Sequence, residues 1–368
     1  MTLRRHTLIL SALAYSVPWI LVGASPTLAE AVKDPCRPSM YPVPVVFYTP
    51  ETELGVGVGI PSSRPDPADC IHRKPDLLVP ALIYTQRRQV IARIYAKQFF
   101  DDENFFIDAI GAFNRYPDKF YGTGDQTAIE DEELFTEKYA SFSGDFYRRI
   151  AKDTYIGPAF VRDEYQIVDT KAGAMLASGA YDGSDTGTIS GTGLRFLHNS
   201  RDNEFQPRRG VIAELGALSF QPSIGSDFNY RMYHARWRSY SPLGSGDILA
   251  FEAVLDANVG KIPFRKLAQL GGQYLLRGFF LGRYRDKALA ASQVEWRHDL
   301  TDAWSVVGFL GSGKVAPAAN ELNQGRAITS GGFGGRYVLD PQSRINLRLD
   351  IAAGGDSRGI YFGAGEAF

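Results

Sequence analysis

The sequence predicts an all-β protein, a transmembrane antiparallel β-barrel of about 16 strands with one long loop folded into the lumen. Three observations lead to this prediction. Apolar and polar side chains alternate over stretches of about 10 to 14 residues, short polar turns alternate with long connections, and the last expected strand ends on Phe368. Strands of this length with unequal connections are typical of barrels that cross an outer membrane.

The N-terminal residues predict a secretory signal over residues 1–29. Two arginines precede an apolar stretch that reaches Val22, and small residues follow it. This order is typical of a cleaved export signal, and we expect cleavage after Ala29 or Ala31. An uncleaved membrane anchor is the weaker alternative, because the apolar stretch is short and contains Pro18.

The rest of the chain favours a membrane barrel over a helical membrane protein. Beyond Val22, no stretch contains the roughly 20 apolar residues that a membrane-spanning helix needs. We expect residues 30–50 to form an N-terminal periplasmic or plug segment and residues 51–368 to form the barrel. The net charge is -1, which gives no indication of nucleic acid as a partner. The 12% of aromatic residues fits strands and the aromatic belts of membrane interfaces.

Cys36 and Cys70 are the only two cysteines, and both lie in proline-rich segments. In an oxidising, exported compartment they predict a structural disulfide. No cluster of histidines accompanies them, so we expect no metal site and no cofactor.

The clearest alternation lies at residues 344–351. One face carries Ile345, Leu347, Leu349 and Ile351, and the other carries Arg344, Asn346, Arg348 and Asp350. In a soluble sandwich the apolar face would form the core, whereas in an outer-membrane barrel it meets lipid and the polar face lines the lumen. Alternation alone leaves both possibilities open. The strand lengths, the unequal connections and the terminal aromatic residue favour the barrel.

We expect strands at residues 52–60, 77–86, 89–99, 104–115, 134–149, 152–166, 189–200, 209–221, 228–242, 246–258, 289–300, 304–313, 326–338, 343–354 and 358–368. This set is one strand short of an even number, and bacterial single-chain barrels use even numbers. The missing strand is expected within residues 41–50 or 167–180. Residues 259–288 form a long connection that needs a functional explanation, because structureless loops of this length are uncommon in compact domains.

That connection carries a pattern that resembles a known family. The matching residues are Gly271, Gly272, the Leu276-Arg277-Gly278-Phe279 motif and the following Gly282-Arg283-Tyr284-Arg285-Asp286, with Arg201-Asp202-Asn203, Pro207 and Gly210 as a periplasmic turn and Pro50-Glu51-Thr52, Gly55 and Gly57 at a first strand. This set resembles the BamA and TamA type of outer-membrane barrels, also called bacterial surface antigens. The resemblance covers most of residues 43–368.

The resemblance implies that the long loop folds back into the lumen and that its arginine pairs with acidic groups of the inner wall. Strand periodicity places Glu295 on an inward face, which offers Arg277 a partner. Phe309, Gly311 and Gly313 occupy the family's inward-facing pattern, but Gly311 stands where the family has an aspartate. We therefore expect Arg277 to rely on Glu295 and on carbonyls or water. A solvated loop arginine is the alternative.

The two terminal strands are expected to meet in a weak seam that opens toward lipid, since glycine weakens strand pairing. The residues concerned are Gly55, Gly57 and Gly59 on the first strand, and Gly363, Gly365 and Phe368 on the last. Glu366 departs from the apolar residue expected near the end of such a strand. We expect this carboxylate at the rim of the barrel, because a charge on the lipid face costs free energy at mid-membrane.

The resemblance implies insertion or translocation of proteins or lipids at the bacterial outer membrane after signal-directed export. Only about 20 residues are expected between the cleavage site and the first strand, which is too few for the periplasmic POTRA domains of such barrels. The implied partners are outer-membrane lipids, unfolded client proteins or a separate periplasmic protein. We expect no enzyme activity, because no nucleophile elbow, metal-binding helix motif or phosphate loop occurs. A passive porin-like channel or a structural surface barrel is the alternative.

Overall fold

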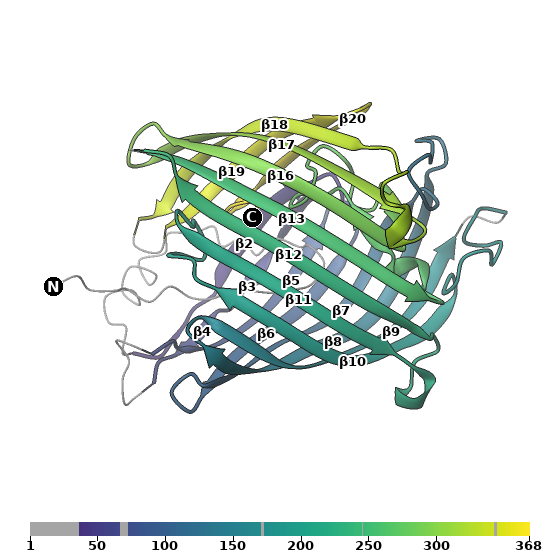
Figure 1. Ribbon diagram of the computed structural model, residues 1–368, viewed down its shortest axis with the longest axis horizontal. Helices are drawn as coiled ribbons and strands as arrows, with labels where there is room; N and C mark the ends of the chain where they lie inside the picture. The colour runs from purple at the N-terminus through teal and green to yellow at the C-terminus, as the bar shows by residue number, and fades with distance from the viewer. Residues whose placement is uncertain (1–36, 67–72, 171–172, 245, 342–343) are drawn as a thin grey trace.

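The computed structural model describes residues 37–66, 73–170, 173–244, 246–341 and 344–368 (Figure 1). The expected signal at residues 1–29, Cys36 and Cys70 lie outside these residues. Within the described residues, no helix has the length and apolar character to cross a bilayer.

The described chain is almost entirely β-structure. Its strands are β1 (Ser39–Met40), β2 (Val43–Thr49), β3 (Glu53–Gly59), β4 (Ser62–Arg64), β5 (Asp76–Thr85), β6 (Val90–Phe100), β7 (Phe105–Phe120), β8 (Glu133–Ala151), β9 (Thr154–Thr170), β10 (Thr186–Asn199), β11 (Gly210–Phe220), β12 (Tyr230–Pro242), β13 (Asp247–Gly260), β14 (Ala268–Leu270), β15 (Tyr284–Asp286), β16 (Ala288–Asp299), β17 (Trp304–Ala316), β18 (Ile328–Asp340), β19 (Ile345–Gly354) and β20 (Ser357–Ala364). Three short 3-10 helices lie in connections: η1 (Pro222–Ile224), η2 (Phe264–Lys266) and η3 (Ala319–Glu321).

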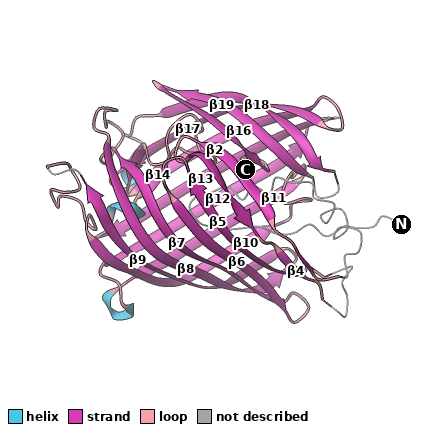
Figure 2. Ribbon diagram, turned by 180° about the vertical axis from the view of Figure 1, so that it is seen from behind, coloured by secondary structure: helices cyan, strands magenta, loops and turns pink. Residues whose placement is uncertain are grey.

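In the described part of the chain, 16 of these strands close into one antiparallel barrel, which confirms the predicted fold class. Each strand pairs with its neighbour in the sequence, and β2 meets β20 to close the ring. β1 and β4 are short additions at the edge of β5, and β14 and β15 form a separate hairpin. The strands run obliquely around the barrel, with β11, β12 and β13 on the near wall in Figure 1 and β5 to β9 behind them. Figure 2 shows the same barrel from the opposite side.

The first strand differs from the prediction. β2 supplies the missing strand, within one of the two expected ranges, and the barrel therefore begins at Val43 rather than at residue 51. Residues 50–52 form a tight turn, closed by the bond from the Thr52 N–H to the Thr49 carbonyl oxygen at 3.3 Å. β2 and β3 are consequently one hairpin, and β3 is the second strand of the ring.

On β19 the polar side chains lie inside the barrel and the apolar ones outside. Leu349 and Ile351 are 47% and 45% exposed, whereas Arg348 and Asp350 are 1% and 0% exposed. This excludes the soluble sandwich, whose alternation would bury the apolar face. The alternation of apolar-out and polar-in side chains is that of a barrel surrounded by lipid.

We call the two ends of the barrel the loop end and the turn end. The loop end carries the connections at residues 121–132, 171–185, 221–229, 261–287 and 317–327, and the turn end carries those at residues 101–104, 152–153, 200–209, 243–246 and 300–303. Residues 261–287, hereafter the inward loop, join β13 to β16 and contain η2, β14 and β15.

Two apolar clusters flank the inward loop inside the barrel. One joins Phe264 and Leu267 of the loop to lumen-facing residues of β7 to β12, such as Phe120 and Phe220. The other joins residues 268–284 of the loop to β13, β16, β17 and β18. Because the loop belongs to both clusters, apolar side chains fill the lumen near the loop end.

Candidate functional site: the inward loop and the seam

The inward loop folds tightly because several of its residues adopt left-handed backbone conformations. Gly278 has φ = +112°, and a methyl group added to it would lie 2.9 Å from the backbone carbonyl carbon of Ala353. Only glycine meets both demands without strain. Leu276, which precedes the arginine, also has a positive φ of 52°. These conformations project Arg277 from the loop toward the inner wall.

Arg277 is completely buried and binds two carboxylates. Its Nη2 lies 2.6 Å from Oε2 of Glu295 on β16, and its Nη1 lies 2.6 Å from Oδ2 of Asp350 on β19. The guanidinium carbon lies 3.4 Å from the centre of the Phe309 ring on β17, in cation–π contact. The structure thus brings together Arg277, Glu295 and Phe309, and it buries the arginine side chain rather than exposing it in a solvated loop.

Sequence reasoning missed Asp350. We expected carbonyls or water to replace the family's aspartate at Gly311, but the second carboxylate comes from β19. Gly311 serves packing instead: a methyl group there would lie 3.0 Å from Cβ of Gln293 on β16 and 3.4 Å from Cδ1 of Leu276 in the loop. Gly313 is tighter, since a methyl group would lie 2.7 Å from Cδ1 of Leu270. Both glycines leave room for the inward loop against β17.

The pair of carboxylates around Arg277 belongs to a larger buried network. Glu295 also binds Arg297 Nε at 2.8 Å, and Asp350 also binds Arg336 Nη1 at 2.6 Å. Arg336 Nε in turn binds Glu366 Oε2 at 2.7 Å. Each buried charge in this network therefore has a partner of opposite sign. Burial of a charge away from water is tolerated when the charge is paired in this way. The network links the loop to β16, β18, β19 and the residues after β20.

Phe279 anchors the loop by its shape. Its ring packs edge-on against Tyr284, with ring centres 5.6 Å apart and an interplanar angle of 72°. On the wall side it occupies the space above Gly354, where an added methyl group would lie 2.3 Å from the ring. The aromatic residue of the motif therefore fits a hollow that glycine leaves at the end of β19.

The inward loop also bonds to the strands on both sides of the seam. The Gly278 N–H donates to Tyr361 Oη of β20 at 2.8 Å, and the Leu281 N–H donates to Glu51 Oε1 in the turn after β2 at 2.8 Å. Burial raises the pKa of Glu51, while the hydrogen bond from Leu281 acts in the opposite direction. The loop thus braces the first hairpin and the last strand from inside.

The seam itself is short. Among the described residues, β2 and β20 share one registered pair, Tyr48 with Phe362, whereas β2 and β3 pair over the whole of β2. The expected role of Gly55, Gly57 and Gly59 at the seam is wrong, because these glycines lie on β3 and face β2 and β5. Gly55 instead makes room for the ring of Phe47, which would lie 2.5 Å from an added methyl group.

The last strand ends earlier than expected. Gly363 lies on β20 opposite Arg348. Gly365 has φ = +79°, and the chain turns there into the lumen. Phe368 is 5% exposed and packs with Tyr240 and Ala250. The expectation that Glu366 lies at the rim is wrong, since its side chain is 2% exposed inside the barrel.

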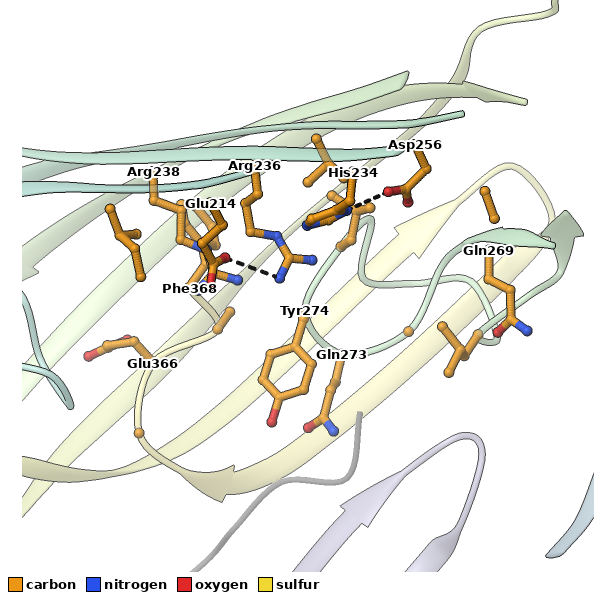
Figure 3. A pocket seen from close by; sticks show the side chains of 18 of the residues that line it. Glu214, His234, Arg236, Arg238, Asp256, Gln269, Gln273, Tyr274, Glu366 and Phe368 are labelled. Carbon is orange, nitrogen blue, oxygen red and sulfur yellow. Dashed lines mark hydrogen bonds and ion pairs between the residues drawn. The ribbon is translucent and has the colours of Figure 1, made fainter. Parts of the chain in front are cut away.

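A cavity of about 410 Å³ with a mixed polar and apolar lining remains between the inward loop and the turn end (Figure 3). A hydrogen-bonded pair and an ion pair line it: His234 Nδ1 lies 2.5 Å from Asp256 Oδ1, and Arg236 Nη1 lies 3.8 Å from Glu214 Oε2. Gln273 and Tyr274 of the loop also border the cavity. No group of three or more His, Cys, Asp or Glu side chains in the described ranges is arranged to hold a metal ion.

Sequence and structure comparisons place this geometry in a family. Residues 83–368 match the Omp85 superfamily domain. No curated protein is detectably similar to the chain in sequence. Among solved structures, BamA from Haemophilus ducreyi lacking POTRA domains 1-3 has a similar fold, with a TM-score of 0.62 and 15% identity, over 89% of this chain and 70% of that chain.

Two structures of CdiB are similar as well. CdiB from Acinetobacter baumannii has a TM-score of 0.57 and CdiB from Escherichia coli one of 0.58, each at 10% identity and over 89% of this chain. The match spans 65% and 63% of those two proteins, so this chain covers less than two thirds of their length. At these identities the likeness concerns the fold. Barrels of this superfamily lie in outer membranes. The chain belongs to the Omp85 superfamily.

Proposed function

We propose that this chain is an outer-membrane barrel that inserts or translocates proteins or lipids by opening sideways at the β2–β20 seam. The observation that carries the proposal is the contrast in strand pairing. One registered pair closes the ring, while β8 and β9, for example, are registered from Phe135 to Ala151. Opening the barrel at the seam therefore breaks far fewer backbone hydrogen bonds than opening it elsewhere.

The unpaired part of β2 supports a protein client. Residues 43–47 of β2 are registered with β3 on one side only, which leaves a strand edge at the seam. Such edges accept an additional extended segment through main-chain hydrogen bonds. An unfolded client that enters from the turn end could pair there while its apolar face reaches lipid through the seam. A separate periplasmic partner could deliver it.

The filled loop end argues against the passive channel. A porin-like pore needs a continuous water path, but Phe264 of the inward loop lies 5.3 Å from Phe120 and 5.5 Å from Phe135, measured between ring centres. In outer-membrane barrels the long connections face the cell exterior, so we assign the loop end to that side. The lumen would then be accessible from the periplasm and closed to the exterior.

The test is client folding in reconstituted liposomes. Liposomes that contain this protein should accelerate folding of a denatured client barrel, compared with empty liposomes. The matched control is the same protein with Tyr48→Cys and Phe362→Cys oxidised across the seam, in a background of Cys36→Ser and Cys70→Ser. We expect acceleration to disappear on oxidation and to return on reduction. Equal rates in all samples, together with a steady ion current, would favour the passive channel.

A further inference from the structure

The residues after β20 turn away from the sheet into the lumen, and we call residues 365–368 the tail. The last ladder bond is from the Gly365 N–H to the Asn346 carbonyl oxygen at 2.8 Å. Beyond it, Glu366 Oε2 accepts from Arg336 Nε at 2.7 Å and Glu366 Oε1 accepts from Asn346 Nδ2 at 2.8 Å. Arg297 Nη2 donates to the carbonyl oxygen of Phe368 at 2.7 Å.

Side-chain alternation explains why Glu366 is a poor residue for an extended strand at this place. On β20, Arg358 and Ile360 are exposed on the outer face, while Gly359 and Tyr361 are buried on the inner face. If the strand continued straight, Glu366 would fall on the outer face with the other even-numbered residues. There the carboxylate would lose its two partners and approach lipid, which is unfavourable to a degree that depends on depth.

The edge of β2 at the seam could pair with the tail, but the tail does not lie there. The antiparallel register pairs Tyr48 with Phe362. Continued by the same rule, this register would set Glu366 opposite Pro44 and Ala367 opposite Val43. β2 extends to Val43, so its edge is present along this stretch. β20 already leaves β2 after Phe362, since Gly363 and Ala364 have no registered partner on β2, and the tail in the lumen continues this separation.

We propose that Glu366 is a latch that holds the tail in the lumen and thereby keeps the seam short. When the latch is released, the tail extends β20 along β2 and lengthens the seam. Two arrangements of the same four residues thus compete, one bonded to Arg297, Arg336 and Asn346, the other to the edge of β2. The role of this switch in client passage rests on the proposed function, whereas the position of the tail does not.

The tail is connected to the inward loop through Arg297, which binds Glu295 and Phe368, and the latch residue itself is connected through Arg336. Arg336 binds both Glu366 and Asp350, and Asp350 binds Arg277 of the loop. Movement of the loop away from Asp350 would leave that carboxylate to Arg336 and the more distant Arg348, and would change how strongly Arg336 holds Glu366. Through this network, the position of the inward loop would affect how firmly the tail is held, and therefore the length of the seam.

Cysteine cross-links can report both arrangements. In a background of Cys36→Ser and Cys70→Ser, Ala367→Cys is combined either with Ala250→Cys or with Val43→Cys. Ala250 and Ala367 share the cluster that buries the tail, so the first pair reports the tail in the lumen. The second pair reports the extended register. Each pair is oxidised in the otherwise native barrel, in Glu366→Leu and in Glu366→Gln, with Glu130→Leu at an exposed loop position as the control.

We expect the native barrel and Glu130→Leu to cross-link mainly through the 250–367 pair. Glu366→Leu should shift the ratio toward the 43–367 pair by about tenfold or more, because the tail loses a charge-assisted hydrogen bond and gains an apolar side chain for the lipid face. An unchanged ratio in Glu366→Leu overturns the proposal. If that variant does not give a heat-modifiable barrel, Glu366→Gln decides, since it keeps the size and removes the charge.

Client folding separates the latch from the proposed function. If the cross-links shift in Glu366→Leu and client folding slows with them, both ideas are supported. If the cross-links shift but no protein sample accelerates client folding, the latch stands and the proposed function fails. If the native barrel does not cross-link through the 250–367 pair, the tail does not occupy the lumen and the latch is wrong.

Discussion

Arg277 and Asp350 are 73 positions apart in the sequence, and their side chains meet at 2.6 Å inside the barrel. Because neither side chain is exposed, each forms with the other an ion pair that takes the place of hydrogen bonds to water. Glu295 on β16 completes the arrangement from the opposite side of the guanidinium. The inward loop is therefore fixed to two walls of the barrel by one residue, and the predictions below follow from that attachment and from its surroundings.

Removal of one partner of this buried group should destabilise the barrel. We expect Glu295→Ala and Asp350→Ala each to lower the free energy of unfolding by about 3 kcal/mol, because an uncompensated charge remains in the interior. Urea midpoints and heat-modifiability on gels measure the effect. Arg209→Ala, at an exposed arginine of the 200–209 turn, should leave both unchanged. Wild-type heat-modifiability in Glu295→Ala would refute the pairing.

The hollow above Gly354 should be necessary for docking of the loop. Gly354→Val places methyl groups where the Phe279 ring lies, so we expect the motif to be displaced. Trypsin should then cut the inward loop in intact proteoliposomes, whereas the native loop stays protected. Gly308→Val is the control, since nothing lies within 4 Å of the position of its added methyl group. Equal protection in both variants would show that Phe279 does not need this hollow.

Glu51 should make stability depend on pH in a defined direction. Its pKa is raised above the ordinary value of 4.5, first because of burial, so the folded protein holds this proton more tightly than the unfolded chain. The stability from this residue is therefore present below its ordinary pKa and is lost as pH rises through the raised value. Glu51→Gln can still accept the bond from Leu281 but cannot ionise. When the pH is raised from about 4 to about 8, a range that spans the titration of a glutamate with a raised pKa, the urea midpoint of the variant should therefore fall less than that of the native protein. A larger fall in the variant would contradict this assignment.

Conductance should depend on the apolar cluster at the loop end. Phe264 is 1% exposed and packs between Phe120 and Phe135. Phe264→Ser should let water enter this cluster and raise the current in planar bilayers, while the native barrel conducts little. Ile224→Ser, at a residue 37% exposed in η1, serves as the control. A native current as large as that of Phe264→Ser would mean that the cluster does not limit ion flow.

The period of two in the sequence, together with the strand lengths and the unequal connections, was sufficient to predict the barrel and the direction of most side chains. It placed Glu295 and Asp350 on polar faces because lipid and lumen select opposite side chains on alternate positions. It could not show that Asp350 faces Arg277, since that contact depends on how the ring closes across the lumen. The resemblance of the loop motif supplied Arg277 and Glu295 as partners, but it directed attention to Gly311 and away from β19.

Two further errors have local causes. The barrel was expected to begin at residue 51, and β2 was only one of two candidate ranges for the missing strand, because it is short and contains Pro44, which weakens a strand pattern. Glu366 was placed at the rim because alternation was assumed to continue to Phe368. A left-handed glycine at position 365 ends the alternation, and glycine alone in a sequence does not reveal which conformation it adopts.

The packing of Phe264 among aromatic side chains of the wall has a consequence for the envelope as a whole. If this cluster closes the lumen as proposed, a membrane that carries many copies of such a barrel stays impermeable to small hydrophilic solutes, because the described part of each copy offers them no watery route from one face to the other. Toxic compounds outside would gain no entry through the resting protein. A cell could therefore make many copies of the barrel without making its outer membrane leaky.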